Sequence, residues 1–130
     1  MKEQELRIGN LFYYHIEDSM DKRKKWDEVS TIDAQDIDYL IRNPDDEDYK
    51  PIPLTEEWLL KFHTKEEIEK NTRFPNEITI YDRFLFIWKE NYKYWYVITS
   101  YHKEYLTKIE FVHEYQNFIF SLTGEELTLK

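Results

Sequence analysis

FLFIWKENYKYWYVIT, residues 84–99, is the stretch that decides the fold. It is dense in aromatic and β-branched side chains, which are typical of strands. Two strands, Ile78 to Lys89 and Tyr92 to Tyr101, are predicted to flank a turn at Glu90-Asn91. Both faces of this hairpin carry aromatic residues, whereas a sheet covered on one side buries only one face. Most of these aromatic residues are therefore expected in the core, and the rest form a candidate exposed binding patch.

The segments around the hairpin alternate between strand and helix patterns. The strand patterns cover Leu6 to Ile16, with a turn or bulge at Gly9, then Trp26 to Ile32 and Leu106 to Phe111. The helix patterns cover Asp33 to Arg42, Thr55 to Phe62, a short turn at Thr64 to Glu67, and Val112 to Leu122 with Gly124 as the stop. We predict an α+β fold: a single domain over residues 1–130, with an antiparallel sheet of about five strands and helices packed on one face.

Composition argues against several classes of chemistry. Four Trp, eleven Tyr and eight Phe accompany only two Gly and no Cys, so thiolate catalysis and phosphate-binding glycine loops are excluded. No serine lies in a G-x-S-x-G elbow. The histidines form no H-E-x-x-H motif, and we interpret them as surface or core-edge residues, with a catalytic or metal role for one of them as the alternative: His15, His63, His102 and His113. The sequence predicts a protein that is not an enzyme and has no catalytic residues, cofactor or metal site.

The hydropathy of the sequence indicates in which cellular compartment the protein is located. The longest uninterrupted apolar run, Phe84 to Trp88, is far shorter than the ~20 residues that span a bilayer. No apolar signal-peptide stretch follows the N-terminal residues, and the absence of Cys gives no sign of an oxidising compartment. We expect a cytoplasmic protein that does not bind a membrane.

The formal net charge of −9 is unevenly spread along the chain. Seven acidic residues and one basic residue lie between Asp33 and Asp48. Four of the acids form the predicted acidic loop, a candidate partner-binding site: Asp45, Asp46, Glu47 and Asp48. The loop lacks the spacing and the glycine of a calcium-binding loop, so it is either a solvated loop or a contact for a basic partner. An acidic surface argues against binding of free DNA.

A basic run next to a tryptophan is the second candidate site. It consists of Lys22, Arg23, Lys24, Lys25 and Trp26. Basic residues beside an aromatic ring can hold single-stranded nucleic acid. The run is either a solvated loop or a contact with phosphate or with an acidic surface.

Three stretches resemble a family of small uncharacterised proteins from phages and integrated mobile elements of bacteria. They are ELRIGNL (5–11), PIPLTEEWLLKF (51–62), and VHEYQN (112–117) running into LTGEEL (122–127). The resemblance implies a mobile-element origin and supplies no catalytic residues.

With this resemblance, the small size and the acidic loop favour an anti-defence protein, an anti-CRISPR. In the cytoplasm of the host bacterial cell it would bind a host CRISPR effector nuclease, in the narrower form of the hypothesis an RNA-targeting one, and block guide or target engagement stoichiometrically. The basic run is the candidate contact with the guide RNA of that nuclease. The alternative is a phage housekeeping module in assembly or replication.

Overall fold

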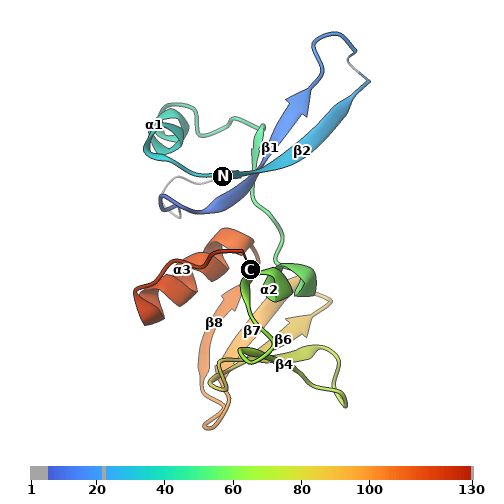
Figure 1. The fold of residues 1–130 in the computed structure, drawn as a ribbon, viewed down its shortest axis with the longest axis vertical. Helices are drawn as coiled ribbons and strands as arrows, with labels where there is room; N and C mark the ends of the chain where they lie inside the picture. The colour runs from blue at the N-terminus through green and yellow to red at the C-terminus, as the bar shows by residue number, and fades with distance from the viewer. Residues whose placement is uncertain (1–5, 22, 130) are drawn as a thin grey trace. The chain divides into compact units, whose positions relative to one another are not determined.

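The computed structural model describes residues 6–21 and 23–129 (Figure 1). These residues form three α-helices and eight β-strands in two antiparallel sheets, which confirms the predicted α+β class. The chain divides into two compact units, Met1–Pro53 with Phe111–Glu126 (unit 1) and Leu54–Glu110 with Leu127–Lys130 (unit 2). That the two units act as the one domain over residues 1–130 stays a prediction.

Unit 1 contains a three-stranded sheet in the order β2-β1-β3 and the helices α1 and α3. Its elements are β1 (Leu11–Glu17), β2 (Lys25–Thr31), α1 (Ala34–Arg42), β3 (Tyr49–Lys50) and α3 (Val112–Thr123). Phe12 is buried and stacks on Tyr49, with ring centroids 5.0 Å apart. The same core includes Leu6, Ile32 and Leu40, with Tyr14 and Ile37 packed against it.

Both helices of unit 1 begin and end where the sequence predicts. Asp33 caps α1 by accepting a hydrogen bond from the Asp36 amide at 2.8 Å, and the Asp36 carboxylate accepts from the Asp33 amide in return. Gly124 ends α3 in the left-handed conformation, at φ 73°. These local capping signals fix helix ends because they satisfy backbone groups that the helix leaves open.

The predicted strand from Leu6 is shorter in the structure, because β1 begins at Leu11. Gly9 lies in a turn before the strand, with φ +99°, and its amide donates to the Ile32 carbonyl at 2.9 Å. The Ile32 amide in turn donates to the Asn10 carbonyl at 2.7 Å, so Gly9 and Asn10 lie opposite one residue, as the predicted turn or bulge requires.

Unit 2 contains a five-stranded sheet in the order β4-β5-β6-β7-β8 and the helix α2. Its elements are α2 (Glu56–Phe62), β4 (Ile68–Lys70), β5 (Glu77–Ile80), β6 (Phe84–Lys89), β7 (Tyr94–Thr99) and β8 (Tyr105–Ile109). The predicted strand from Ile78 to Lys89 is in fact two strands, because Tyr81 and Asp82 take positive φ angles of 55° and 56° and turn the chain. At the predicted short turn, the Glu67 amide donates to the Thr64 carbonyl at 3.1 Å and the Glu67 carboxylate accepts from the Thr64 amide at 3.0 Å, and the chain then enters β4.

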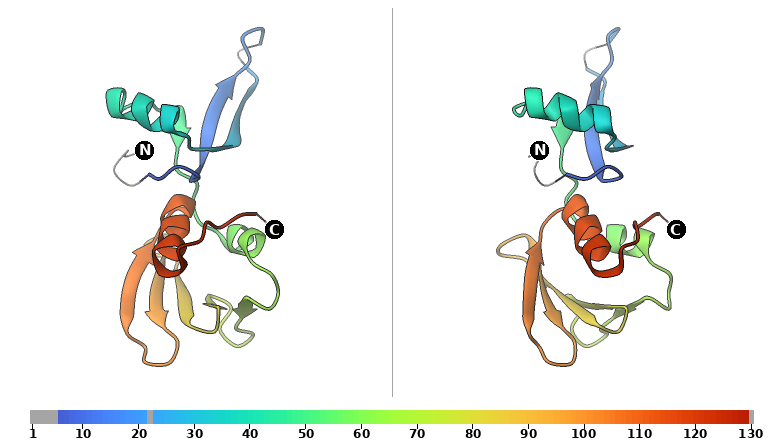
Figure 2. Two further views of the ribbon diagram at one scale, coloured as in Figure 1. Left: turned by 60° about the vertical axis from the view of Figure 1, so that its left-hand side comes forward. Right: turned by 90° about the vertical axis from the view of Figure 1, so that its left-hand side faces the viewer.

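The two faces of the five-stranded sheet differ in burial. One face is apolar and buried, and it carries Ile78, Ile80, Phe86, Trp95, Val97 and Ile109. The Trp95 indole N–H donates to the Leu54 carbonyl at 2.8 Å, which joins this face to the segment that leads into α2. In both views of Figure 2 the helix α2, in green, lies to one side of the sheet. Leu85, Tyr94 and Tyr96 point to the other face and are half-buried.

Candidate functional site

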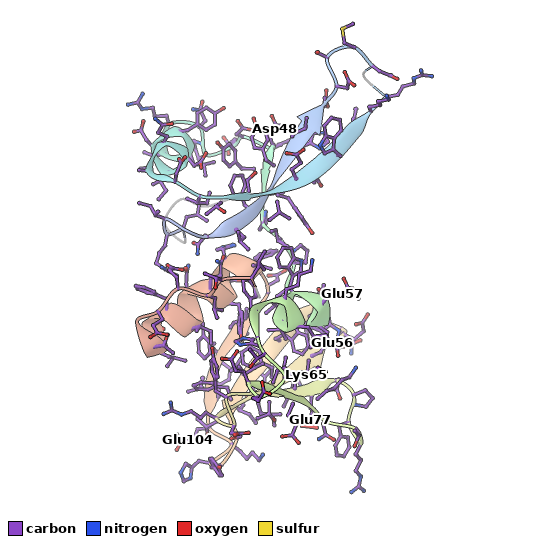
Figure 3. All side chains as sticks on the ribbon, in the orientation of Figure 1. Asp48, Glu56, Glu57, Lys65, Glu77 and Glu104 are labelled. Carbon is purple, nitrogen blue, oxygen red and sulfur yellow. The ribbon has the colours of Figure 1, made fainter. Side chains whose placement is uncertain are left out.

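The predicted acidic loop connects α1 to β3 in unit 1. Asp45 and Glu47 are exposed, whereas Asp46 and Asp48 are half-buried. Asp48 directly precedes β3, and its carbonyl accepts from the His15 amide of β1 at 2.8 Å (Figure 3). Among the salt bridges of residues 6–21 and 23–129, none involves these four acids. The negative charge of the loop is thus left without an internal counter-ion in the described part of the chain.

Asp46 holds the shape of the acidic loop. Its carboxylate accepts from the Tyr39 hydroxyl at 2.5 Å and from the Asp48 amide at 2.8 Å. The hydrogen bond from Tyr39, with a further one from the Asp48 backbone, lowers the pKa of Asp46 below its usual value. Asp46 therefore has a structural role, and Asp45 and Glu47 are the loop acids that are free to meet a partner.

A shallow hollow of about 360 Å³ borders this loop. It is lined by Tyr39, Arg42, Asn43, Pro44, Asp45 and Asp46. Tyr39 is 42% exposed although it bonds Asp46, so the rim offers an aromatic ring beside carboxylates. This combination suits a basic side chain, which a carboxylate and an aromatic face both attract.

The predicted basic run lies at the turn of the β1–β2 hairpin, and Lys22 lies outside the described residues. Arg23 contacts Asp21 at 3.1 Å, and Lys25 contacts Glu17 at 3.6 Å. Lys24 is exposed. Trp26 is 43% exposed and donates from its indole to Glu28 at 2.9 Å. Two of the basic residues thus have acidic neighbours, which lowers the net charge that the run offers to phosphate.

The acidic loop and the basic run flank the same strand. Asp48 bonds the backbone of His15, and Glu17, two residues further along β1, pairs with Lys25. Between them, Asp27 contacts the His15 ring at 2.9 Å and Lys50 at 3.4 Å. The hydrogen bond from His15 lowers the pKa of Asp27. The sequence patterns did not reveal this surface cluster, because the register of β1 with β2 and β3 creates it.

Unit 1 also contains a buried polar network that the sequence patterns did not predict. Asn10 and Gln116 are 0% and 1% exposed. The Gln116 side chain accepts from the Leu11 amide at 2.8 Å and donates to the Gly9 carbonyl at 3.1 Å. Asn10 accepts from the Arg7 amide at 2.7 Å and donates to Asn117 at 2.9 Å. Every polar group of these two side chains has a partner, so the network fastens the chain before β1 to α3.

Arg7 extends this network towards the surface. Its guanidinium donates to Asn117 at 2.8 Å, forms a salt bridge with Glu126, and lies 4.0 Å from the centre of the Phe120 ring. Residues 6–11 and 112–126, which belong to two of the stretches quoted for the resemblance, therefore meet in space through their polar residues. The one signal in the sequence is the amide side chain of Asn10 among apolar residues, whereas Gln116 lies among polar residues and shows no such pattern. Because the network is satisfied and mostly buried, it is a structural element of unit 1.

The described residues contain no group of three or more His, Asp or Glu side chains that could hold a metal ion. His63 and His113 are 5% and 2% exposed, and they contact aromatic rings, of Tyr81 at 5.1 Å and of Phe111 at 5.8 Å.

No helix within residues 6–21 and 23–129 has both the length and the apolar character needed to cross a membrane. Comparisons with protein families, curated proteins and solved structures find no match to this chain.

Proposed function

We propose that this protein is an anti-defence inhibitor of mobile-element origin that binds a host RNA-guided nuclease. The observation that carries the proposal is the charge difference between the two units. Unit 1 has 17 acidic and 8 basic residues, a net charge of −9, whereas unit 2 has ten of each and a net charge of zero. The whole net charge of the protein therefore belongs to unit 1.

Concentrated negative charge favours a partner with a basic surface, such as the nucleic-acid channel of a nuclease. Long-range attraction raises the association rate, and exposed acids at the rim of an interface act mainly in this way. Asp45 and Glu47 are exposed and near the hollow that Tyr39 and Arg42 line. Tyr39 and the half-exposed Trp26 would supply aromatic anchors, which dominate binding energy at many interfaces.

The proposed mechanism is occupancy without chemistry. The inhibitor would fill the channel that guide or target must enter, so one molecule would inactivate one nuclease. An RNA-targeting effector is the narrower form of the proposal. The partner would first be identified by a pull-down from host lysate, with and without RNase, followed by mass spectrometry. Titration of the purified nuclease should then lower its activity in proportion to the inhibitor added and level off at a fixed molar ratio.

The double variant Asp45→Lys, Glu47→Lys tests the binding surface. Both side chains are exposed, so the variant should fold normally. It should associate with the nuclease about tenfold more slowly in about 50 mM salt, and the difference should shrink as salt screens the charges. The matched control is Glu66→Lys, Glu104→Lys, which makes the same charge change on exposed residues of unit 2 (Glu104 is labelled in Figure 3).

Two results would contradict the proposal. Inhibition by a small fraction of an equivalent, with turnover of a substrate, would show that the protein is an enzyme. Equal loss of association in both double variants would show that total charge matters and that the acidic loop is not the contact.

A second candidate function, a phage assembly or replication module, is favoured by the edge strand β2. This strand lies at the edge of its sheet, and Trp26 and Val29 on it are 43% and 46% exposed. Open edges pair readily with other strands. If the chain forms a defined oligomer in light scattering, and Val29→Lys returns it to a monomer, the assembly function is favoured over the inhibitor.

A further inference from the structure

The outward face of the five-stranded sheet in unit 2 carries a group of tyrosines and lysines that the proposed function does not use. The register places Tyr94 opposite Lys89, and Tyr96 opposite both Ile87 and Lys108. Tyr105 lies opposite Ile98 on the same face. We call Lys89, Tyr94, Tyr96, Tyr105 and Lys108 the tyrosine face. The helix α2 does not cover it, because the buried side of the sheet, through Trp95, bonds the segment that leads into α2.

The rings of the tyrosine face are arranged in pairs in which a half-buried ring, Tyr94 or Tyr96, lies against an exposed one. Tyr96 and Tyr105 have ring centroids 5.0 Å apart, and Tyr105 is 55% exposed. Tyr94 stacks on Tyr92 at 5.5 Å with an angle of 18° between the ring planes, and Tyr92 is 68% exposed. A solvated sheet face normally carries polar residues, so a row of tyrosines on one is unusual.

Two lysine ammonium groups lie close to these rings. The Lys89 ammonium lies 5.5 Å from the centre of the Tyr96 ring, and the Lys108 ammonium lies 5.4 Å from that of Tyr94. Among the strand residues, the acids of this face are Glu69 and Glu77, which lie on β4 and β5 at the other end of the sheet. The exposed Glu110 directly follows β8. The part of the face formed by β6, β7 and β8 therefore combines aromatic planes with positive charge.

We propose that the tyrosine face binds single-stranded nucleic acid. Bases would stack on Tyr94, Tyr96 and Tyr105, and backbone phosphates would pair with Lys89 and Lys108. Aromatic platforms flanked by cations are the shared feature of proteins that bind single strands without reading sequence. Common RNA-binding modules also bind unpaired bases by stacking them on aromatic residues of a sheet face.

The charges favour a nucleic acid over a basic or an apolar peptide. The two lysines would repel a basic peptide, and the tyrosine hydroxyls and ammonium groups would be poorly matched to an apolar one. The net charge of zero on unit 2 removes the general objection that an acidic protein repels phosphate. Two phosphate contacts predict weak binding, in the micromolar range, with a shallow salt dependence. This inference does not rest on the nuclease proposal, which concerns unit 1.

The test measures fluorescence anisotropy of labelled oligouridylate and oligothymidylate of about 12 nucleotides, a length suited to one small binding platform. Titration with the full chain in about 50 mM and about 200 mM salt should give micromolar binding that weakens with salt. The RNA and DNA arms decide which strand is preferred, and a duplex of the same length should bind more weakly because its bases are already stacked.

Two variants address the face directly. Tyr94→Thr, Tyr96→Thr removes two rings and keeps strand propensity, and it should weaken binding about tenfold or more. Lys89→Glu, Lys108→Glu should weaken binding and flatten the salt dependence, with little effect on folding because the charges are exposed. The matched control Lys61→Glu, Lys65→Glu makes the same charge change on exposed residues of unit 2 in and beside α2.

The control variant carries the same charge change as Lys89→Glu, Lys108→Glu, so it should bind the oligonucleotides with clearly higher affinity than that variant. No change in anisotropy up to about 100 µM protein in about 50 mM salt would overturn the inference, since even non-specific binding is usually detectable there. Equal weakening by the two lysine pairs would overturn it as well, because binding would then follow total charge and not the tyrosine face.

Discussion

Replacing Gln116 by Met tests whether the buried polar network stabilises unit 1. Methionine has nearly the same length and volume as glutamine, so the change removes hydrogen bonds and leaves no large cavity. Gln116 is 1% exposed, and its two side-chain bonds go to the backbone of Gly9 and Leu11. In the variant, the Leu11 amide and the Gly9 carbonyl lose these partners.

The expected loss follows from those two backbone groups. A buried donor or acceptor without a partner costs about 1–3 kcal/mol. Gly9 and Leu11 are only half-buried, so water can reach part of the site, and the two losses together should reach about 2–4 kcal/mol. This is a large part of the 5–15 kcal/mol that typically stabilises a small protein.

The assay is urea unfolding followed by far-UV circular dichroism at pH 7, with the free energy of unfolding taken from the midpoint and slope. The matched control is Gln35→Met, the same substitution at an exposed position of α1. The control should stay within about 0.5 kcal/mol of the wild type. If Gln116→Met is as stable as the control, the network does not stabilise the fold and the reasoning fails.

Two further predictions concern the core and the acidic loop. Trp58→Ala should lower the free energy of unfolding by about 3–5 kcal/mol, because Trp58 is 6% exposed on α2. Leu60→Ala, at a 53% exposed position of the same helix, is the control and should have little effect. Equal melting temperatures in the two variants would show that the buried side of α2 is assigned wrongly. Asp46→Asn should destabilise the protein at pH 7, and the loss of stability should shrink as the pH falls below the unfolded pKa of about 3.9. The folded-state pKa of Asp46 is lowered, so its carboxylate contributes stability above the unfolded value and loses that contribution as it is protonated. Thermal melts at pH 7 and at successively lower pH, with Asp45→Asn as the control, measure the difference, and a gap of the same size at every pH would contradict the pKa argument.

The sequence alone determined the parts of this fold that depend on neighbouring residues. Asp33 and Thr55 begin α1 and α2, and Gly124 ends α3, at the positions expected from their capping chemistry. The β6–β7 hairpin also lies where the aromatic run predicts it. Such signals act over one helical turn or one strand pair, so a local pattern is enough to find them.

The limits of local pattern appear at Tyr81 and Asp82. Neither residue type demands a positive φ, yet both adopt one and divide the predicted long strand into β5 and β6. The pairing of β5 with β6 over four residue pairs requires a reversal there.

Only the tertiary structure decided which side chains share a surface. Asn10 and Asn117 are 107 positions apart in the chain and 2.9 Å apart in space, and no periodicity links them. Tyr39 and Asp46 give the acidic loop a structural residue, which the charge pattern does not distinguish from its neighbours. The aromatic residues of the central hairpin divide between the buried face and the tyrosine face according to strand register. Strand register and long-range contacts depend on how the whole chain buries its apolar surface. A local sequence pattern therefore cannot predict them.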